Sequence, residues 1–333
     1  MAALSDQMLV VAMLAYLVAM MCYAAEWAFG DRGVVARVAS RELVGAATAG
    51  ASAGGTAAGG SSVAVAEPPA VSPVAAVDRP SRALWAGRAA VVVTLVAIAV
   101  HGVSLVSRGL AAERVPWGNM YEFILAGTFI AAVGWVVVLV RAPSARPVGM
   151  FVALTMVVLL GVDGLLLYTP VGPLVPALDS YWLVVHVISV AVASGVFLLG
   201  FVTAVLFLLR DGYEKGKRGF PFSLAARIPA APSLERLTFR LHAFAFPIWT
   251  FGALIAGPIW AEAAWGRYWG WDPKEVWAFI SWVIYAGYLH ARATPSVKRT
   301  TATWIAILGF LTMQMNLYGV NIFFEGLHSY GGV

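Results

Sequence analysis

The sequence predicts an all-α fold, a polytopic membrane helix bundle of about eight transmembrane helices. The composition is 61% hydrophobic and only 12% charged, whereas charged residues make up about a quarter of a soluble domain. Apolar stretches long enough to cross a bilayer, which needs about 20 helical residues each, also recur along the chain. The stretches lie approximately at 8–29, 84–107, 120–141, 148–169, 181–209, 243–262, 275–291 and 302–323.

The first stretch predicts a membrane helix that is retained, followed by a linker. Asp6 but no Lys or Arg precedes it, and no small-residue cleavage site follows a short apolar core, so a signal peptide is not expected. Residues 43–77 are rich in Ala, Gly, Ser and Pro, and they hold too little apolar surface to offset the entropy of ordering. We therefore expect three parts: an N-terminal transmembrane helix at 1–29, a flexible cytoplasmic linker at 30–82, and a membrane core at 83–333.

The basic residues predict the orientation. Loops on one side of the membrane hold 17 of the 22 Lys and Arg residues, and the positive-inside rule places these loops in the cytoplasm. An even number of spans then puts both termini outside, together with the loop between the sixth and seventh spans. The net charge of +5 reflects this asymmetry, so no nucleic-acid partner is expected.

The most unusual local feature is the sequence WGRYWGWDPKE at 265–275, the tryptophan run. Four large aromatics fall within its first seven residues, where two glycines let flat rings approach closely. Interfacial Trp residues are common in membrane proteins, so an aromatic belt is one reading and a platform for a large flat ligand is the other. Asp272, Pro273 and Glu275 predict a helix start, with Asp272 as N-cap and Glu275 completing a capping box.

Histidines are the candidate ligands. At 1.5 Å per helical residue, His186 and His328 lie on the same side of the membrane as the tryptophan run. His290 lies near the cytoplasmic side, about 28 Å from Trp271 if the segment is helical throughout, and His242 lies at a similar depth. A lone intramembrane histidine more often bonds a carbonyl or hydroxyl of another helix than a metal. The complete set is His101, His186, His242, His290 and His328.

A haem would use these features together, because it is a flat apolar macrocycle with two anionic propionates and one or two axial imidazoles. Cys22 is the only cysteine, which excludes a disulfide, a CxxC motif and a covalent CxxCH haem within the chain. The predicted outer surface offers ring faces from Trp265, Trp269 and Trp271, imidazoles from His186 and His328, and cations from Arg267 and Lys274.

Several motifs resemble a known family. WGRYWGWDPKE resembles the tryptophan-rich WWD signature of haem-handling proteins, and the resemblance covers roughly residues 100–333. The chain resembles the CcsA/ResC-type family of system II cytochrome c biogenesis, whose members are also called CcsB. The other supporting motifs lie at 116–122, 178–186, 246–261, 288–292 and 309–330.

The resemblance implies roles for individual residues. His186 and His328 would ligate the iron of haem b at the outer face. His290 would be an inner haem ligand that receives haem from the cytoplasmic side, together with a histidine of a partner subunit. The family pattern leads us to expect no histidine at position 242. The external platform would consist of Trp265, Arg267, Tyr268, Trp269, Trp271 and Asp272.

The resemblance also implies a reaction and partners. Haem would be transported to the outer face and joined by thioethers to the CxxCH of an apocytochrome c. A ResB-type membrane protein would complete this cytochrome c synthase, and thiol-reducing proteins are further expected partners. The location would be the plasma membrane, or the thylakoid membrane in a plastid relative, with the active site on the external side.

Three other functions remain open. A haem exporter without ligation activity shares every feature above. A transporter of another class would use intramembrane histidines or interrupted helices, although the sequence shows no paired short spans in corresponding halves. A quinol-type haem oxidoreductase would need facing histidines, for which His242 with His290 is the only pair at matching depth.

Overall fold

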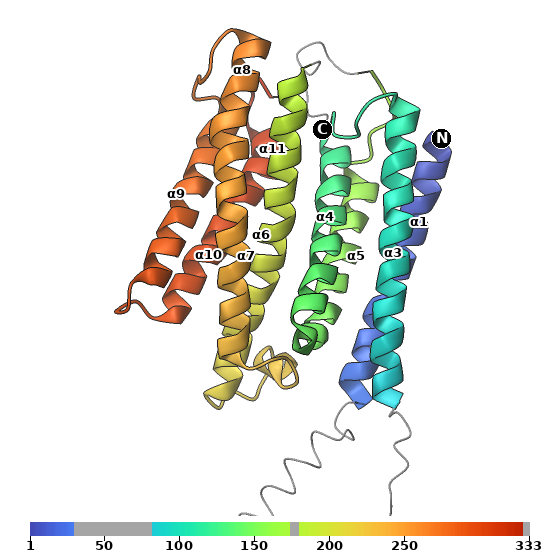
Figure 1. Cartoon of the computed structure of the whole chain (residues 1–333), viewed down its shortest axis with the longest axis vertical. Coiled ribbons are helices and arrows are strands. Elements are labelled where there is room, and N and C mark those ends of the chain that lie inside the picture. The colour runs from blue at the N-terminus through green and yellow to red at the C-terminus, as the bar shows by residue number, and fades with distance from the viewer. Residues whose placement is uncertain (30–81, 174–179, 329–333) are drawn as a thin grey trace, which may run out of the picture.

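The structure is a computed structural model that describes residues 1–29, 82–173 and 180–328. The described residues form long helices side by side in one bundle (Figure 1). The predicted linker lies outside these ranges, except for residue 82, so the proposed division of the chain stays a prediction. The main elements are α1 (Ala2–Phe29), α3 (Arg82–Ala112), α4 (Met120–Arg141), α5 (Gly149–Leu166), α6 (Tyr181–Glu214), α7 (Ala231–Phe251), η5 (Gly252–Ala256), α8 (Gly257–Trp265), α9 (Pro273–Ala293), α10 (Arg299–Gln314), η6 (Met315–Gly319) and α11 (Val320–Phe323).

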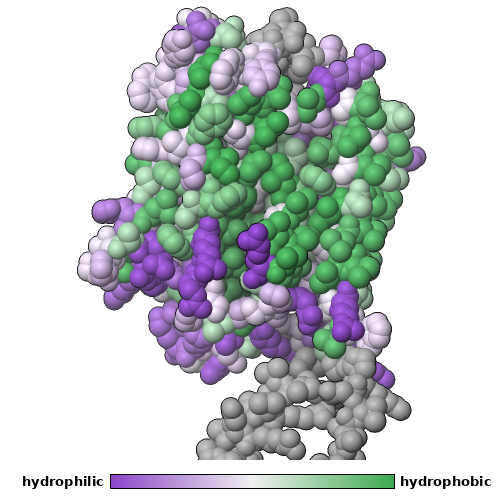
Figure 2. Space-filling model, viewed as in Figure 1, coloured by the Kyte–Doolittle hydropathy of each residue, from purple (hydrophilic) through white to green (hydrophobic). Residues whose placement is uncertain are grey.

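The predicted fold class, an all-α membrane bundle, is confirmed. Within the described ranges, seven helical segments are long and apolar enough to cross a membrane. Figure 2 shows hydrophobic side chains over the middle of the bundle, with hydrophilic ones gathered mainly at its ends. The seventh predicted span, 275–291, corresponds to α9, which has 21 residues and contacts α7 and α10 but is less apolar than these seven segments.

Two spans contain wide helical turns. The sixth predicted span, 243–262, begins earlier than expected because the amphipathic stretch near 232–241 runs directly into it as α7. The π-helical segment η5 then connects α7 to α8. The last span contains a second π-helical segment, η6, before α11. Such segments are rare and often occur at functional sites.

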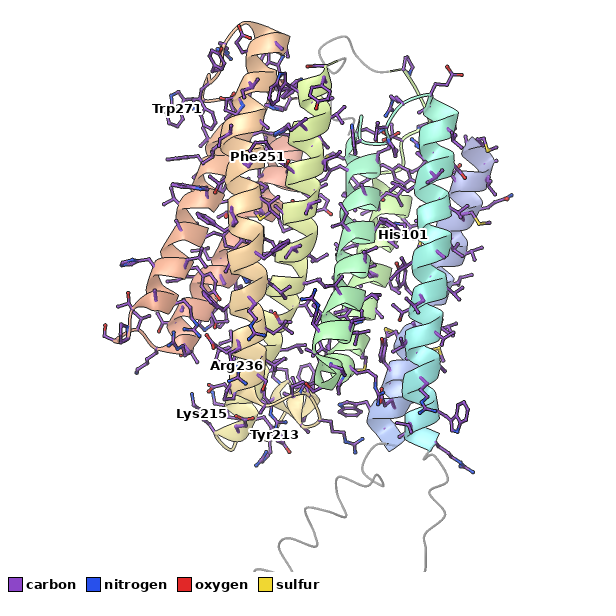
Figure 3. The ribbon with its side chains drawn as sticks, viewed as in Figure 1. His101, Tyr213, Lys215, Arg236, Phe251 and Trp271 are labelled. Carbon is purple, nitrogen blue, oxygen red and sulfur yellow. The ribbon has the colours of Figure 1, made fainter. Side chains whose placement is uncertain are left out.

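Helices α1 and α3 form a tightly associated pair at one side of the bundle (Figure 1). Ser5 Oγ donates to the carbonyl of Ser104 at 2.9 Å, and Ser104 Oγ donates back to the carbonyl of Ser5 at 2.8 Å. The ring of His101 (Figure 3) lies between the Tyr16 hydroxyl, at 3.3 Å, and the Leu125 carbonyl, at 3.1 Å. Interhelical polar contacts of this kind join membrane helices, so His101 has a structural role.

The two ends of the bundle differ. The tryptophan end holds the tryptophan run and also the start of α1 and His328, the last described residue. The basic end holds the turns that follow α6 and α9, and Lys215 and Arg236 lie there (Figure 3). The first and last described residues therefore lie at the same end.

A buried ion cluster fixes the strap between α3 and α4 at the tryptophan end. Glu122, fully buried, accepts from Arg108 Nε at 3.0 Å and from Arg114 Nη1 at 2.6 Å. It also accepts from the backbone N–H of Gly118 at 2.8 Å. Asn119 caps α4, since its Oδ1 accepts from the N–H of Glu122. The cluster ties α3 to the strap and to the start of α4, and residues of the strap and of α4 line the cavity described next.

Candidate functional site

A cavity of about 220 Å³ lies at the tryptophan end. Its walls come from the strap before α4, from α4, α6, α7, η5 and α8, from the loop before α9, and from α9, α10, η6, α11 and the chain after α11. Most of the lining is apolar or aromatic with a few polar groups, which is typical of a small-molecule site. Four of the predicted site residues line it, namely His186, Trp265, Trp269 and His328.

His186 enters the cavity from the first turns of α6. Its Nδ1 lies 2.8 Å from the carbonyl oxygen of Gly252. A carbonyl can only accept, so Nδ1 carries the proton and Nε2 is the basic nitrogen. The imidazole stacks on Trp260, with centroids 5.7 Å apart and planes 10° from parallel. The ring is therefore oriented on two sides before any ligand binds.

The helix around η5 provides the acceptor for His186. The carbonyl oxygen of Gly252 accepts a hydrogen bond from the N–H of Gly257, five residues later. Pro258 has no N–H with which to continue the α-helical pattern. A Cβ added at Gly257 would lie 3.1 Å from the His186 ring. The glycine thus lets the imidazole approach the widened turn.

His328 reaches the cavity from the chain after α11. Its Nδ1 lies 2.7 Å from Asp272 Oδ2, and Asp272 Oδ1 accepts from the N–H of Leu327 at 2.7 Å. Burial alone would raise the pKa of the Asp272 carboxyl, but the hydrogen bonds from His328 and Leu327 hold it below its ordinary value. Asp272 is therefore ionised at neutral pH and acts as the acceptor, which leaves Nε2 of His328 as the basic nitrogen.

Trp260 connects the two histidines. Its buried ring lies 5.6 Å from the His328 ring as well as against His186. Trp265 lies 4.9 Å from His328 and 4.8 Å from Trp260, measured between ring centroids. Two imidazoles separated by most of the core sequence thus share one aromatic wall. Trp260 was not among the predicted site residues, because nothing in its local sequence shows that it faces a cavity.

Asp272 also starts α9, as the capping box predicts. Its side chain accepts from the N–H of Lys274, and Glu275 Oε2 accepts from the N–H of Asp272 at 3.0 Å. Glu275 Oε2 also accepts from Gly270 at 2.8 Å. The carboxylate that caps the helix is the one that bonds His328, a second use that the sequence did not reveal.

The predicted aromatic platform is divided between the cavity and the surface. Trp265 and Trp269 line the cavity, whereas Tyr268 and Trp271 are 61% and 65% exposed. Figure 3 shows Trp271 pointing away from the bundle. Trp271 also has a left-handed backbone, with φ of 58°, a strained conformation for a bulky residue that tends to occur at functional sites.

The cationic candidates are divided in the same way. Arg267 is exposed and does not line the cavity. Lys274, in the first turn of α9, is the only Lys or Arg among the described lining residues. It is therefore the cation best placed to meet an anionic group of a ligand in this cavity.

The chain is similar to known proteins over the region that holds the cavity. Residues 117–328 match the model of the family described as "Cytochrome C assembly protein". The chain is 33% identical over 285 residues to the cytochrome c biogenesis protein CcsA of Porphyra purpurea, covering 73% of this chain and 86% of that protein. It is 32% identical over 282 residues to CcsA of Synechocystis, covering 68% and 82%. The chain belongs to the cytochrome c assembly protein family.

The match extends over the cavity and its walls. A CcsA of Guillardia theta is 39% identical over 173 residues, which cover 48% of this chain and 57% of that protein. The expected resemblance to CcsA-type proteins is thus confirmed, and the chain has a role in cytochrome c biogenesis. The matched range begins at Trp117 and ends at His328, so it includes both histidines of the cavity.

The remaining two candidate histidines, His290 and His242, face different surroundings. His290, near the end of α9, is exposed. His242 is fully buried, with Nδ1 2.8 Å from the carbonyl of Thr238 and its ring against Tyr285 and Tyr288. Depth along the helices predicted them as a pair, but the structure does not bring them into one site.

No group of three or more His, Cys, Asp or Glu side chains suited to a metal ion occurs among the described residues. The cavity offers two imidazoles, those of His186 and His328.

Proposed function

We propose that this chain binds haem b between His186 and His328, at the outer face of the membrane, and presents it to an apocytochrome c. The observation that carries the proposal is that both histidines line one cavity with Nδ1 already bonded. A ring nitrogen bonded to a fixed acceptor is the arrangement that ligating histidines usually have, with the other nitrogen as the ligand to the metal. The family role in cytochrome c biogenesis makes haem the expected ligand.

The cavity walls fit the other parts of a haem. Trp260, Trp265 and Trp269 offer aromatic surface for the apolar macrocycle. Lys274 offers a cation for a propionate, which would be costly to bury without a partner. The lining is mostly apolar, so it suits the ring more than a hydrated ion.

The chemistry proposed at this site is thioether formation. Each thiol of the acceptor CxxCH adds across a haem vinyl group: sulfur bonds to one vinyl carbon and the thiol hydrogen ends on the other. The addition involves no net oxidation or reduction, but it requires reduced thiols, which agrees with thiol-reducing proteins as partners. The chain contributes by holding the haem in a position that the acceptor can reach.

His290 supports an inner station for haem. Its exposure near the end of α9 leaves it accessible to a histidine of a ResB-type partner. We expect His290→Ala to lower the haem that reaches the outer cavity, and added imidazole to restore it. Unchanged haem content at normal expression would assign His290 a structural role.

Orientation and location complete the proposal. The basic end holds Lys215 and Arg236 (Figure 3), and the positive-inside rule would turn this end toward the cytoplasm. The cavity then faces outward, where apocytochrome c is found. The membrane would be the plasma membrane, or the thylakoid membrane in a photosynthetic relative.

The test is to purify the full chain with and without a co-expressed ResB-type protein. We expect the optical spectrum of low-spin haem with two histidine ligands, and thioether-linked cytochrome c when the partner and a CxxCH acceptor are present. Bound haem without product in the complete system would indicate an exporter. Absence of bound haem under both conditions, with folded protein, would overturn the proposal.

A further inference from the structure

The two cavity histidines have unequal hydrogen-bond acceptors. His328 Nδ1 donates to a carboxylate, Asp272, at 2.7 Å. His186 Nδ1 donates to a neutral carbonyl, that of Gly252, at 2.8 Å. Both bonds fix the tautomer, but a carboxylate raises the basicity of the opposite ring nitrogen more than a carbonyl does, because it stabilises positive charge on the imidazole.

From this difference we infer that His328 is the permanent axial ligand and His186 the exchangeable one. Asp272 is then a positioning residue that strengthens the bond from His328 Nε2 to iron. The inference rests on the proposed function, since it names which ligand yields when the acceptor arrives.

The surroundings of Asp272 reinforce the first ligand. The carboxylate is 6% exposed and is tied to the start of α9 and to the N–H of Leu327. A Cβ added at Gly326 would lie 2.6 Å from Asp272 Oδ1, so the chain that carries His328 passes directly over the carboxylate. The bonded pair is therefore held from both sides.

The surroundings of His186 strengthen its bond to iron less than those of His328 do. The Gly252 carbonyl is shared, because it also accepts the N–H of Gly257 within η5. Asp272 Oδ2 also accepts a second N–H, that of Lys274, so the difference between the two acceptors is one of charge: the carboxylate is anionic and the carbonyl is neutral. The imidazole keeps its orientation through Trp260 but receives little electronic reinforcement.

A defined exchange follows. The histidine of the acceptor CxxCH would form a new bond to iron as the bond from His186 Nε2 breaks, while His328 stays bound. The iron keeps six ligands before and after, and no electron is transferred. The acceptor would then approach from the α6 side of the haem, opposite the Asp272 loop.

The test uses carbon monoxide as the competing ligand on the reduced, haem-loaded full chain. Carbon monoxide replaces the weaker axial ligand, and photolysis leaves a five-coordinate haem whose iron–histidine stretch is read by resonance Raman spectroscopy. The band reports the hydrogen bond of the retained histidine, and a carboxylate acceptor raises its frequency. We expect a high-frequency band in the wild type that is unchanged in His186→Gly whose haem content has been restored with imidazole.

Two variants separate this effect from helix capping. Asp272→Asn keeps a side chain that can cap α9 but removes the charge, so the band should fall and haem affinity should drop by about 10- to 100-fold. Glu275→Gln alters the capping box without contacting His328, so its band should match the wild type.

The inference is overturned if the band has the same frequency in Asp272→Asn as in the wild type, or if its frequency changes in His186→Gly. Either result would show that His186 is the retained ligand. Failure of the proposed function would look different: no spectrum of two axial histidines would exist to begin with. The two failures are thus distinguishable in one set of samples.

Discussion

The tryptophan end and the basic end both place a histidine against aromatic rings, yet they differ in what surrounds it. His186 stacks on Trp260 and also borders the cavity. His242 lies against Tyr288 at 4.9 Å between centroids, and a Cβ added at Gly200 would come within 2.5 Å of its ring. Each donates from Nδ1 to a backbone carbonyl oxygen at 2.8 Å.

The difference shows that a bonded imidazole beside aromatic rings is not by itself a ligand site. His242 fills its own space, and no room is left for a macrocycle. His186 and His328 are accompanied by an open volume whose walls are held by helix caps, a π-helical turn and the Glu122 cluster. Space that the fold keeps open is the feature that distinguishes the tryptophan end.

Removal of a cavity histidine should have the largest effect. His186→Gly or His328→Gly deletes a predicted axial ligand, so we expect nearly all copurifying haem to be lost. Imidazole added during expression should restore it, because the deleted ring leaves room for the free base. Haem content is measured by the optical spectrum per mole of chain, and full haem content in the double variant would contradict the assignment.

The Glu122 cluster should give the next largest effect. Glu122→Gln leaves Arg108 and Arg114 without their shared carboxylate in a buried place, and breaking a buried pair in this way costs about 3–5 kcal/mol. The matched control at the basic end is Glu214→Gln, whose ion pair with Arg210 is partly exposed and worth about 0–1 kcal/mol. Thermal unfolding in detergent compares them, and equal losses would show that the cluster does not hold the cavity wall.

Lys274 should have a smaller effect that leaves the fold intact. Lys274→Gln removes the only described cation of the cavity lining, and a charge-assisted hydrogen bond to a propionate is worth about 1.5–3 kcal/mol. Haem affinity should fall by roughly ten- to a hundredfold by the same range, while iron protoporphyrin dimethyl ester should bind both proteins alike. Arg267→Gln is the control on the exposed part of the same loop, and an equal loss there would mean that the propionates lie outside the cavity.

The sequence predicted the fold class and the side of His186 and His328 because these depend on local properties. Apolar length predicts a span, and Asp272 with Glu275 predicts a helix start, which the structure confirms. Counting residues along a helix gives depth, so His186 and His328 could be placed on the side of the tryptophan run.

The sequence could not predict which way a side chain faces, because rotation about a helix axis is decided by its neighbours. His242 and His290 share a depth, but one is buried and the other exposed. Trp260 lines the cavity while Trp271 points away from the bundle, although Trp271 belongs to the more distinctive motif. The second bond of Asp272, to a histidine 56 residues later, is likewise visible only in three dimensions.

His242→Phe should have the smallest effect on haem, and it tests the comparison most directly. The variant loses the bond from Nδ1 to the Thr238 carbonyl, but it also removes Nε2, a buried nitrogen with no hydrogen-bond partner among the described residues. These two changes oppose each other, so unfolding should shift by no more than about 1 kcal/mol. Haem content should equal that of the wild type, since the ring of Phe occupies the same aromatic pocket. Loss of haem at unchanged stability would mean that space opens beside His242 during the cycle, and the basic end would then contain a ligand site as the tryptophan end does.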